Sequence, residues 1–275
     1  MKLGMIGAGR TAAVMGGFFR RKGFTLLGYA SRKFASAQEN ARITDSEAWA
    51  DASALAQACD VVFLSMADDA IPENAKRLAQ SGCTGKLCGM FSGALGSADL
   101  APLSEAGNTV FSLHPPYSFP DKHMNPAALD GVTFTLEGAG ADMDKRRQAL
   151  QAAGIAHQEI RPADKPRYHA AACAGANYLV SLVKLMEELL AGTDIPPALF
   201  QPMARAALDN AFAHGPHAAL TGPIARGDAG TLRRQMAAIP EGTAKDIYAA
   251  LGRYTADWAL TDKQIKDNVK EALKP

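Results

Sequence analysis

Residues 1–33 read MKLGMIGAGRTAAVMGGFFRRKGFTLLGYASRK and give the strongest structural signal in the chain. A short apolar run at 2–7 leads into a glycine turn, a helical pattern and a second apolar run at 24–31. Short β-type runs that alternate with helical patterns indicate βαβ units and a parallel sheet. The N-terminus is therefore predicted to form a strand, a tight turn, a helix and a second strand.

The same alternation continues through the first half of the chain. Further strands are expected at 60–66, 86–93, 108–115, 131–138 and 157–160. After about Pro162 the β signal disappears, and residues 165–192 begin a series of helical patterns with one long helix. We therefore expect an α/β domain with a doubly wound, mostly parallel sheet over residues 1–162, followed by an all-α domain over residues 163–275.

Gly7, Gly9 and Ala12 form a GxGxxA pattern directly after the first apolar run. In this pattern the first glycine permits a tight turn, the second lets the backbone approach a pyrophosphate, and the alanine allows close helix packing. The helix N-terminus also attracts an anion. Because the pattern follows a strand and opens a helix, it indicates a dinucleotide-binding Rossmann domain. The alternative is a glycine turn in an unrelated α/β protein.

The residues after the second strand bear on the choice of cofactor. An NAD site usually has Asp or Glu there to bind the ribose hydroxyls, but no acidic residue precedes Glu39. The chain instead has Ser31, Arg32 and Lys33 at this point. Arg32 could bind a 2′-phosphate through paired charge-assisted hydrogen bonds. We therefore predict NADP rather than NAD; the alternative is that Arg32 and Lys33 begin a solvated helix.

The rest of the expected cofactor site comes from the motif helix and from the end of the apolar run at 60–66. Arg10 and Thr11 lie in the first turn after the glycines. Ser65, Met66 and Ala67 lie at the carboxyl end of this run, at the edge where open α/β sheets bind ligands. We expect the backbone of this loop to line the nicotinamide side of the cofactor.

Two further polar residues are expected at the same edge. Ser92 follows the fifth strand and could bind a substrate or the carboxamide, or could act as a turn or cap residue. His114 precedes two prolines after the sixth strand, and could polarise a carbonyl or orient a carboxylate, or simply pack. Asp68 and Asp69 are expected to cap the next helix.

The helix predicted from residue 165 carries a polar stripe. Lys165, His169, Cys173 and Asn177 recur at four-residue steps, which places them roughly on one face. Transfer of a hydride to C=O or C=N needs a proton donor, and Lys165, Tyr168 or His169 could serve, with Asn177 positioning the substrate. The alternative is a solvated first turn for Lys165 and a domain-packing bond for Asn177.

Composition excludes several classes of protein. Net charge is +1, so no global field indicates binding to nucleic acid or to an anionic membrane. No apolar stretch is long enough for a membrane span, and the four cysteines show no CxxC pair and no metal-ligand spacing. We expect free thiols, no metal site, and a soluble cytoplasmic protein.

A family resemblance rests on GMIGAGRTA, SRK, SGALGSADLAPL, SLHPPYSFP, KPRYHAAACAGANYLVSLV and ALTGPIARGD, in this order. Together they resemble the Rossmann-like proteins whose helical C-terminal part is a domain of unknown function, DUF2520. Such proteins are usually described as NADP oxidoreductases. The layout is more distantly similar to 6-phosphogluconate dehydrogenase, 3-hydroxyisobutyrate dehydrogenase, ketopantoate reductase and pyrroline-5-carboxylate reductase.

The chain departs from the two dehydrogenases and ketopantoate reductase at one point. The resemblance implies a lysine four residues before Asn177, where this chain has Cys173, so Asn177 is the matching position and the general acid is not carried over.

We expect an NADP-dependent oxidoreductase that acts on a small carbonyl, such as a ketopantoate-like keto acid, or on an imine, at a cleft between the domains. The alternatives are a non-catalytic NADP-binding sensor or interaction protein and a deazaflavin-linked NADP reductase. The resemblance also implies a homodimer through the helical domain.

Overall fold

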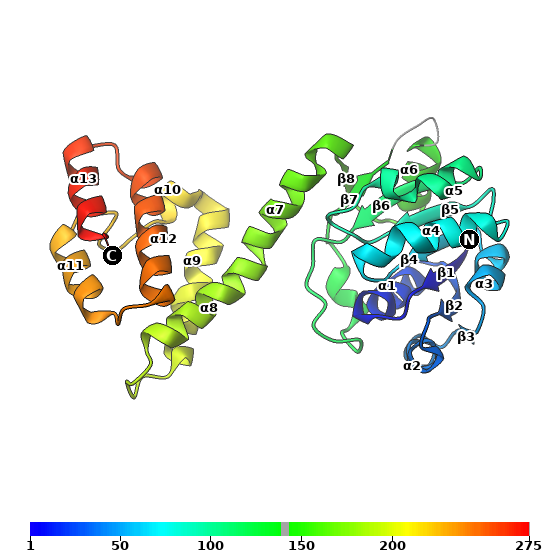
Figure 1. Cartoon of the computed structure of the whole chain (residues 1–275), viewed down its shortest axis with the longest axis horizontal. Helices are drawn as coiled ribbons and strands as arrows, with labels where there is room; N and C mark the ends of the chain where they lie inside the picture. The colour runs from blue at the N-terminus through cyan, green and yellow to red at the C-terminus, as the bar shows by residue number, and fades with distance from the viewer. Residues whose placement is uncertain (139–142, 275) are drawn as a thin grey trace. The chain divides into compact units, whose positions relative to one another are not determined.

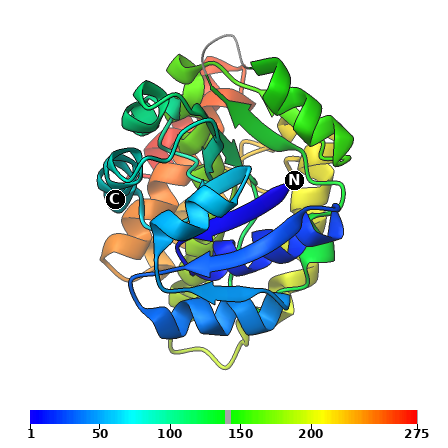
Figure 2. The ribbon, with the colours of Figure 1, turned by 90° about the vertical axis from the view of Figure 1, so that its right-hand side faces the viewer.

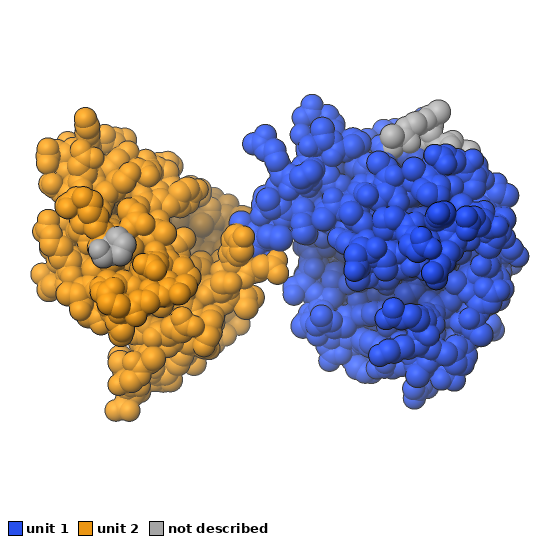
Figure 3. Space-filling view, viewed as in Figure 1, with its two compact units in different colours: residues 1–176 blue, residues 177–275 orange. Residues whose placement is uncertain are grey.

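The computed structural model describes residues 1–138 and 143–274, which form two compact units (Figure 3). The first unit is Met1–Ala176 and the second is Asn177–Pro275. The boundary expected near residue 162 marks the end of the sheet, and the helix that follows it still belongs to the first unit.

The first unit is built on a sheet whose order, among the described residues, is β3-β2-β1-β4-β5-β6-β7-β8 (Figures 1 and 2). The strands are β1 (Lys2–Ile6), β2 (Thr25–Ala30), β3 (Glu47–Trp49), β4 (Val61–Leu64), β5 (Leu87–Met90), β6 (Thr109–His114), β7 (Phe134–Glu137) and β8 (His157–Glu159). The strands from β3 to β6 pair in parallel, whereas β7 runs antiparallel to β6 and β8 runs parallel to β7. The mostly parallel Rossmann-like sheet expected from the sequence is confirmed.

Helices cover both faces of this sheet. They are α1 (Arg10–Arg21), α2 (Phe34–Thr44), α3 (Ala52–Ala58), α4 (Ile71–Gln80), α5 (Ala101–Glu105) and α6 (Met143–Ala152). The last helix of the unit, α7 (Lys165–Gly175), extends away from the sheet, and Lys165 at its start is its one buried residue (Figure 1). Phe63 of β4 belongs to a core shared with α1 and α6, and its neighbour Leu64 to a second core shared with α3, α4 and α5. Strands buried on both faces explain why the sequence shows continuous apolar runs rather than alternation.

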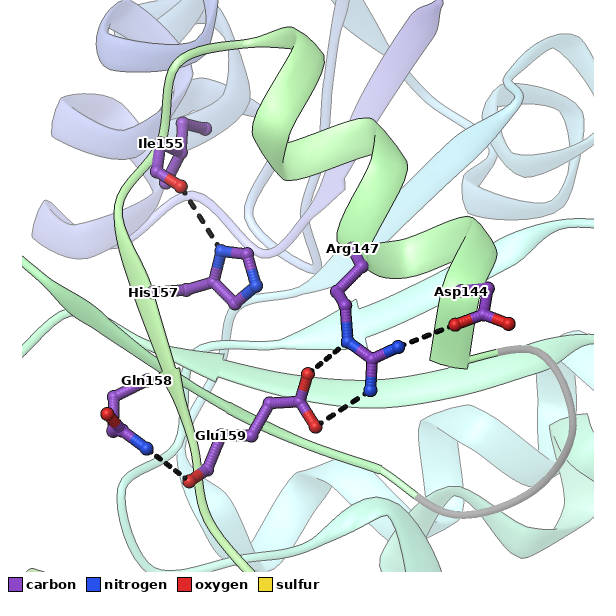
Figure 4. Close-up of polar contacts among 6 residues, drawn as sticks. All are labelled: Asp144, Arg147, Ile155, His157, Gln158 and Glu159. Atoms are coloured by element: carbon purple, nitrogen blue, oxygen red, sulfur yellow. Dashed lines mark hydrogen bonds and ion pairs between the residues drawn. The ribbon is translucent and has the colours of Figure 1, made fainter.

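An ion pair links α6 to the last strand of the sheet (Figure 4). The Arg147 guanidinium binds both carboxylate oxygens of Glu159, with 3.1 Å between Nη2 and Oε2, and also contacts Asp144. Because these side chains are partly exposed, the pair orients α6 more than it stabilises the fold.

The second unit is helical in its described residues. Its helices are α8 (Asn177–Leu189), α9 (Gln201–His214), α10 (Pro216–Ala219), α11 (Ala229–Ala238), α12 (Thr243–Ala259) and α13 (Lys263–Ala272). Leu232, Met236, Ala249, Val269 and Leu273 form the centre of its core. The all-α region expected after the sheet is confirmed. In the part of the chain that the structure describes, no helix is both long and apolar enough to cross a membrane.

The prediction of a single long helix over residues 165–192 is wrong. The chain forms two helices there, because Ala176 leaves the helical region with φ −128° and ψ −66°. Gly175 directly before it has one of the lowest helix propensities, so the last turn of α7 is a weak point. The polar stripe is interrupted before Asn177.

Candidate functional site

The two motif glycines meet different surroundings. Gly7 has a φ of +110°, and a Cβ added there would overlap the carbonyl oxygen of Ser65 in the loop after β4. Its N–H also donates to the Ala30 carbonyl oxygen at 2.8 Å. A Cβ added at Gly9 would instead meet no described atom within 4 Å. Gly7 therefore closes the turn onto neighbouring strands, whereas Gly9 leaves open space in front of α1.

The N-terminus of α1 is available to an anion. Among the described residues, Gly9 provides no side-chain cap, and the first turn of the helix contains no acidic residue. The first N–H groups of a helix lack intrahelical partners and carry the positive end of its dipole. Asn40 of α2 holds the turn in place, since its Nδ2 donates to the Gly9 carbonyl oxygen at 3.2 Å.

Ala12 holds α1 close to the sheet. Its side chain is fully buried, and the Tyr29 hydroxyl of β2 lies 3.4 Å from its carbonyl oxygen. Arg10 lies at the exposed start of the same helix, where its Nη1 donates to the Pro120 carbonyl oxygen at 3.2 Å. Thr11 is partly exposed beside it.

The basic residues after β2 are exposed and unpaired. Within residues 1–138 and 143–274, neither Arg32 nor Lys33 makes an ion pair or a side-chain hydrogen bond, and α2 begins directly after them. The first acid in the chain, Glu39, pairs with Lys122 at 2.6 Å. Uncompensated donors at this position, with Ser31 partly exposed beside them, suit a phosphate group.

The loop after β4 continues the sheet before it turns. The Ser65 N–H still donates to the Ile6 carbonyl oxygen at 2.7 Å, and Met66 is partly buried while Ala67 is exposed. The expectation that Asp68 and Asp69 cap the next helix is wrong, because α4 has no side-chain cap in the described structure. Asp68 instead accepts a hydrogen bond from the next loop.

Ser92 supplies that hydrogen bond. Its hydroxyl donates to Asp68 Oδ2 at 2.9 Å and accepts from the N–H groups of Ala94 and Leu95 at 3.1 and 2.9 Å. A serine hydroxyl has one proton to donate and two lone pairs. All three are used within the protein, so the geometry favours the turn role of Ser92 over direct substrate binding.

Lys165 is buried at the start of α7. Its Nζ donates to Ser112 Oγ at 2.7 Å and to the Ser92 carbonyl oxygen at 3.1 Å, and the residue is 2% exposed. Burial lowers the pKa of Lys165, and the negative charges of Glu137, Asp68 and Asp99 act in the opposite direction. The ammonium group therefore ties α7 to the β5 loop and to β6.

Glu137 is a second buried charge near this lysine. It is 0% exposed, and its carboxylate accepts from the Ser97 N–H at 2.7 Å and from the Ser97 hydroxyl at 2.8 Å. Glu137 and Ser112 are not among the site residues expected from the sequence. Each is a polar residue within an otherwise apolar strand run, and this is the feature of the sequence that could have identified it.

Two histidines and a tyrosine complete the cluster. His114 Nδ1 lies 2.6 Å from the Tyr168 phenol oxygen, and the ring centroids of His114 and His169 are 6.4 Å apart. A Cβ added at Gly93 would lie 2.6 Å from His169 Cδ2 and 2.9 Å from His114 Nε2, so only glycine fits beneath these rings. Burial lowers the pKa of His114 to about 4, and the charges of Lys165 and His169 act in the same direction.

The structure therefore brings four of the five expected catalytic residues together at the ends of β5 and β6. These are Ser92, His114, Lys165 and His169. Asn177 begins α8 in the second unit, where it is exposed.

The carboxyl edge of the sheet thus has an open, basic part at β1 and β2, which we call the nucleotide end. It also has a polar, hydrogen-bonded part at β5, β6 and α7, which we call the reacting end.

Comparison with known families divides the chain into two parts. Residues 1–115 match the model of a Rossmann-like domain, and residues 132–255 match a domain of unknown function, DUF2520. The family resemblance seen in the sequence is confirmed. A comparison with curated proteins found no match.

Several solved structures share the fold over nearly the whole chain. A Bacteroides fragilis protein described as a "putative NADP oxidoreductase" is 19% identical, with 98% of each chain covered and a TM-score of 0.72. A Thermotoga maritima protein is 23% identical, with 93% of this chain and 99% of that chain covered and a TM-score of 0.69. An imine reductase from Myxococcus stipitatus in complex with NADP+ is 15% identical, with 100% of both chains covered and a TM-score of 0.67.

Proposed function

We propose that this chain, in which a Rossmann-like domain precedes a DUF2520 domain, is an NADP-dependent oxidoreductase. Its substrate would be a small carbonyl compound or an imine. One observation carries the proposal: the carboxyl edge of a single sheet combines an unpaired basic anion site with a buried polar cluster. A nucleotide-binding edge that also supports proton transfer is what hydride chemistry requires.

The residues of the nucleotide end fit the cofactor. The space at Gly9 and the uncapped N–H groups of α1 suit a pyrophosphate, with Arg10 beside them. Arg32 and Lys33, which have no ion-pair partner in the part of the chain that the structure describes, offer their charges to a 2′-phosphate. NADP in its reduced form would supply the hydride, and the loops at Ser65–Ala67 and Ser92 would line the nicotinamide.

For the substrate, we infer a keto acid of the ketopantoate type first and a cyclic imine second. The imine is supported by solved structures of the same fold that are imine reductases. A non-catalytic NADP-binding protein or a deazaflavin-linked reductase would share the nucleotide end, so substrate turnover is the deciding observation.

The experiment is a titration of the purified protein with NADPH, NADP, NADH and NAD, repeated on Arg32→Ala. We expect NADPH affinity to fall about 10- to 100-fold in this variant and NADH affinity to change little, because charge-assisted hydrogen bonds to the 2′-phosphate are lost. Arg42→Ala, which removes the same charge from the far end of α2, is the matched control. Equal binding of NADH and NADPH by the wild type would contradict NADP specificity.

The second step is a spectrophotometric screen for NADPH oxidation with a panel of keto acids and cyclic imines. Turnover of a panel member supports the oxidoreductase. Tight NADPH binding without turnover of any member would favour the non-catalytic protein, and binding of a deazaflavin would favour the third option.

The homodimer implied by the resemblance also remains a prediction. The second unit exposes large apolar side chains on α9, where Phe212 is 85% and Met203 63% exposed. Exposed apolar groups of this kind commonly mark association surfaces. Sedimentation velocity of the full chain would test it, and a monomer at micromolar concentration would contradict it.

A further inference from the structure

The reacting end offers several candidates for the group that protonates the substrate, and Lys165 is the least able to do so. Its ammonium group donates to Ser112 Oγ and to the Ser92 carbonyl oxygen, and only 2% of the residue is exposed. A general acid must come within hydrogen-bond reach of the reacting atom. Two of the three N–H groups of Lys165 are used within the protein, and the burial of the residue leaves the third with little access to a substrate.

What Lys165 does instead follows from its contacts. The Ser92 carbonyl oxygen that it binds also accepts from the Ser112 hydroxyl at 2.9 Å, and the Ser92 hydroxyl holds the turn at Ala94 and Leu95. The lysine is thus the central donor of a network that fixes the loop after β5. Gly93 of that loop packs against the two histidines.

His114 is neutral over the physiological range, since burial lowers its pKa to about 4. A neutral imidazole carries one N–H, and the other ring nitrogen is an acceptor. It is therefore a poor source of protons near pH 7, but it can hold a hydroxyl oxygen in place. Its Nδ1 lies 2.6 Å from Tyr168, which shows which group it holds.

Tyr168 has a proton to donate and is partly exposed. It lies one helical turn after Lys165 on α7 and is partly exposed, unlike the lysine. Burial raises the pKa of Tyr168, and the Thr135 hydroxyl acts in the opposite direction, so the phenol carries its proton at neutral pH. The phenol oxygen therefore has a protein partner, His114, that can stabilise the negative charge left after proton transfer.

We infer that Tyr168 is the proton donor of this site, that His114 Nδ1–H holds its phenol oxygen, and that Lys165 is a positioning residue. The inference rests on the proposed function. As the hydride reaches the carbon of C=N or C=O, the Tyr168 O–H bond breaks and a new N–H or O–H bond forms on the substrate. The phenolate keeps its hydrogen bond to His114 and takes a proton from water after the product leaves.

The kinetic test uses Tyr168→Phe, which keeps the ring and removes only the hydroxyl. The matched control is Tyr254→Phe, at an exposed position of α12. The substrate is the keto acid or cyclic imine that the wild type reduces fastest. We expect kcat to fall about 100- to 1,000-fold while KM and the NADPH Kd stay within about twofold, since general acid catalysis contributes in this range. The control should keep the wild-type kcat.

A second measurement does not depend on turnover. In ¹⁵N-histidine NMR spectra of the full chain with NADP bound, His114 should be the Nδ1–H tautomer at pH 7 and should shift in Tyr168→Phe. An Nε2–H tautomer would overturn the inference, because the phenol would then donate its proton to His114 rather than to the substrate.

The outcomes separate this inference from the function beneath it. A wild type that binds NADPH and reduces no panel member overturns both. A wild type that turns over a substrate while Tyr168→Phe keeps its kcat overturns the assignment of Tyr168 alone.

Discussion

The nucleotide end and the reacting end lie along the same edge of the sheet, and they are built in opposite ways. At the nucleotide end, Arg32 and Lys33 are exposed and, among the described residues, without partners, and Gly9 faces open space. At the reacting end, Lys165 and Glu137 are buried and hydrogen-bonded.

This difference indicates how the charged groups of each end are used. Unpaired surface charges cost little to the fold and keep their interaction energy for a ligand. Buried charges cost desolvation energy that hydrogen bonds offset, and in return they hold neighbouring groups in one arrangement. On the proposed function, the nucleotide end would thus provide affinity for the cofactor and the reacting end a fixed geometry.

The largest expected effect contrasts the two glycines of the nucleotide end. Gly7→Ala should lower the free energy of unfolding by about 4 kcal/mol, because it combines a positive φ with a clash against the Ser65 carbonyl. Gly9→Ala should change it by less than about 0.5 kcal/mol, since its Cβ meets open space. Urea unfolding measures both. A similar loss in both variants would show that Gly9 is also needed by the fold.

A smaller effect is expected at the reacting end. Lys165→Met should destabilise the first unit by about 3 kcal/mol, because it keeps the volume but leaves Glu137 buried without its positive neighbour. Lys122→Met, which breaks the surface pair with Glu39, should cost at most about 1 kcal/mol. Adding Glu137→Gln to Lys165→Met should recover part of the loss. No recovery would mean that the two charges do not interact.

The smallest effect is a pH dependence. An unfolded histidine has a pKa of about 6.5, and that of folded His114 is about 4. Between these values the unfolded chain binds the extra proton, so stability falls as pH falls. From pH 7 to pH 5, His114 should account for a loss of about 2 kcal/mol. His114→Gln should be less sensitive over this interval in urea unfolding at each pH, and an unchanged slope would contradict the buried, neutral state.

How much the sequence predicted differs between the two ends. The nucleotide end depends on residues close together in the chain, and the turn at Gly7, the helix at Arg10 and the strand before Arg32 all lie where the pattern placed them. The apolar runs that alternate with helical patterns likewise predicted the parallel sheet, because a continuous apolar run by itself indicates a buried strand.

The reacting end was predicted only in part. The four-residue step from Lys165 to His169 was visible within one helix, and the loop positions of Ser92 and His114 followed from the strand ends. The contact between Lys165 and Ser112 joins residues 53 positions apart. It depends on how α7 packs onto β6, which no local pattern encodes. The break at Ala176 was missed because the alanine-rich sequence around it favours a continuous helix.

That break has a consequence for how such proteins diversify. Because α7 ends at Gly175, each hydrogen-bond partner given above for Lys165, Tyr168 and Ser92 lies within residues 1–176. Substitutions after Ala176 therefore remove none of these hydrogen-bond partners. This hydrogen-bond network can therefore be inherited as one module while the helical remainder is exchanged.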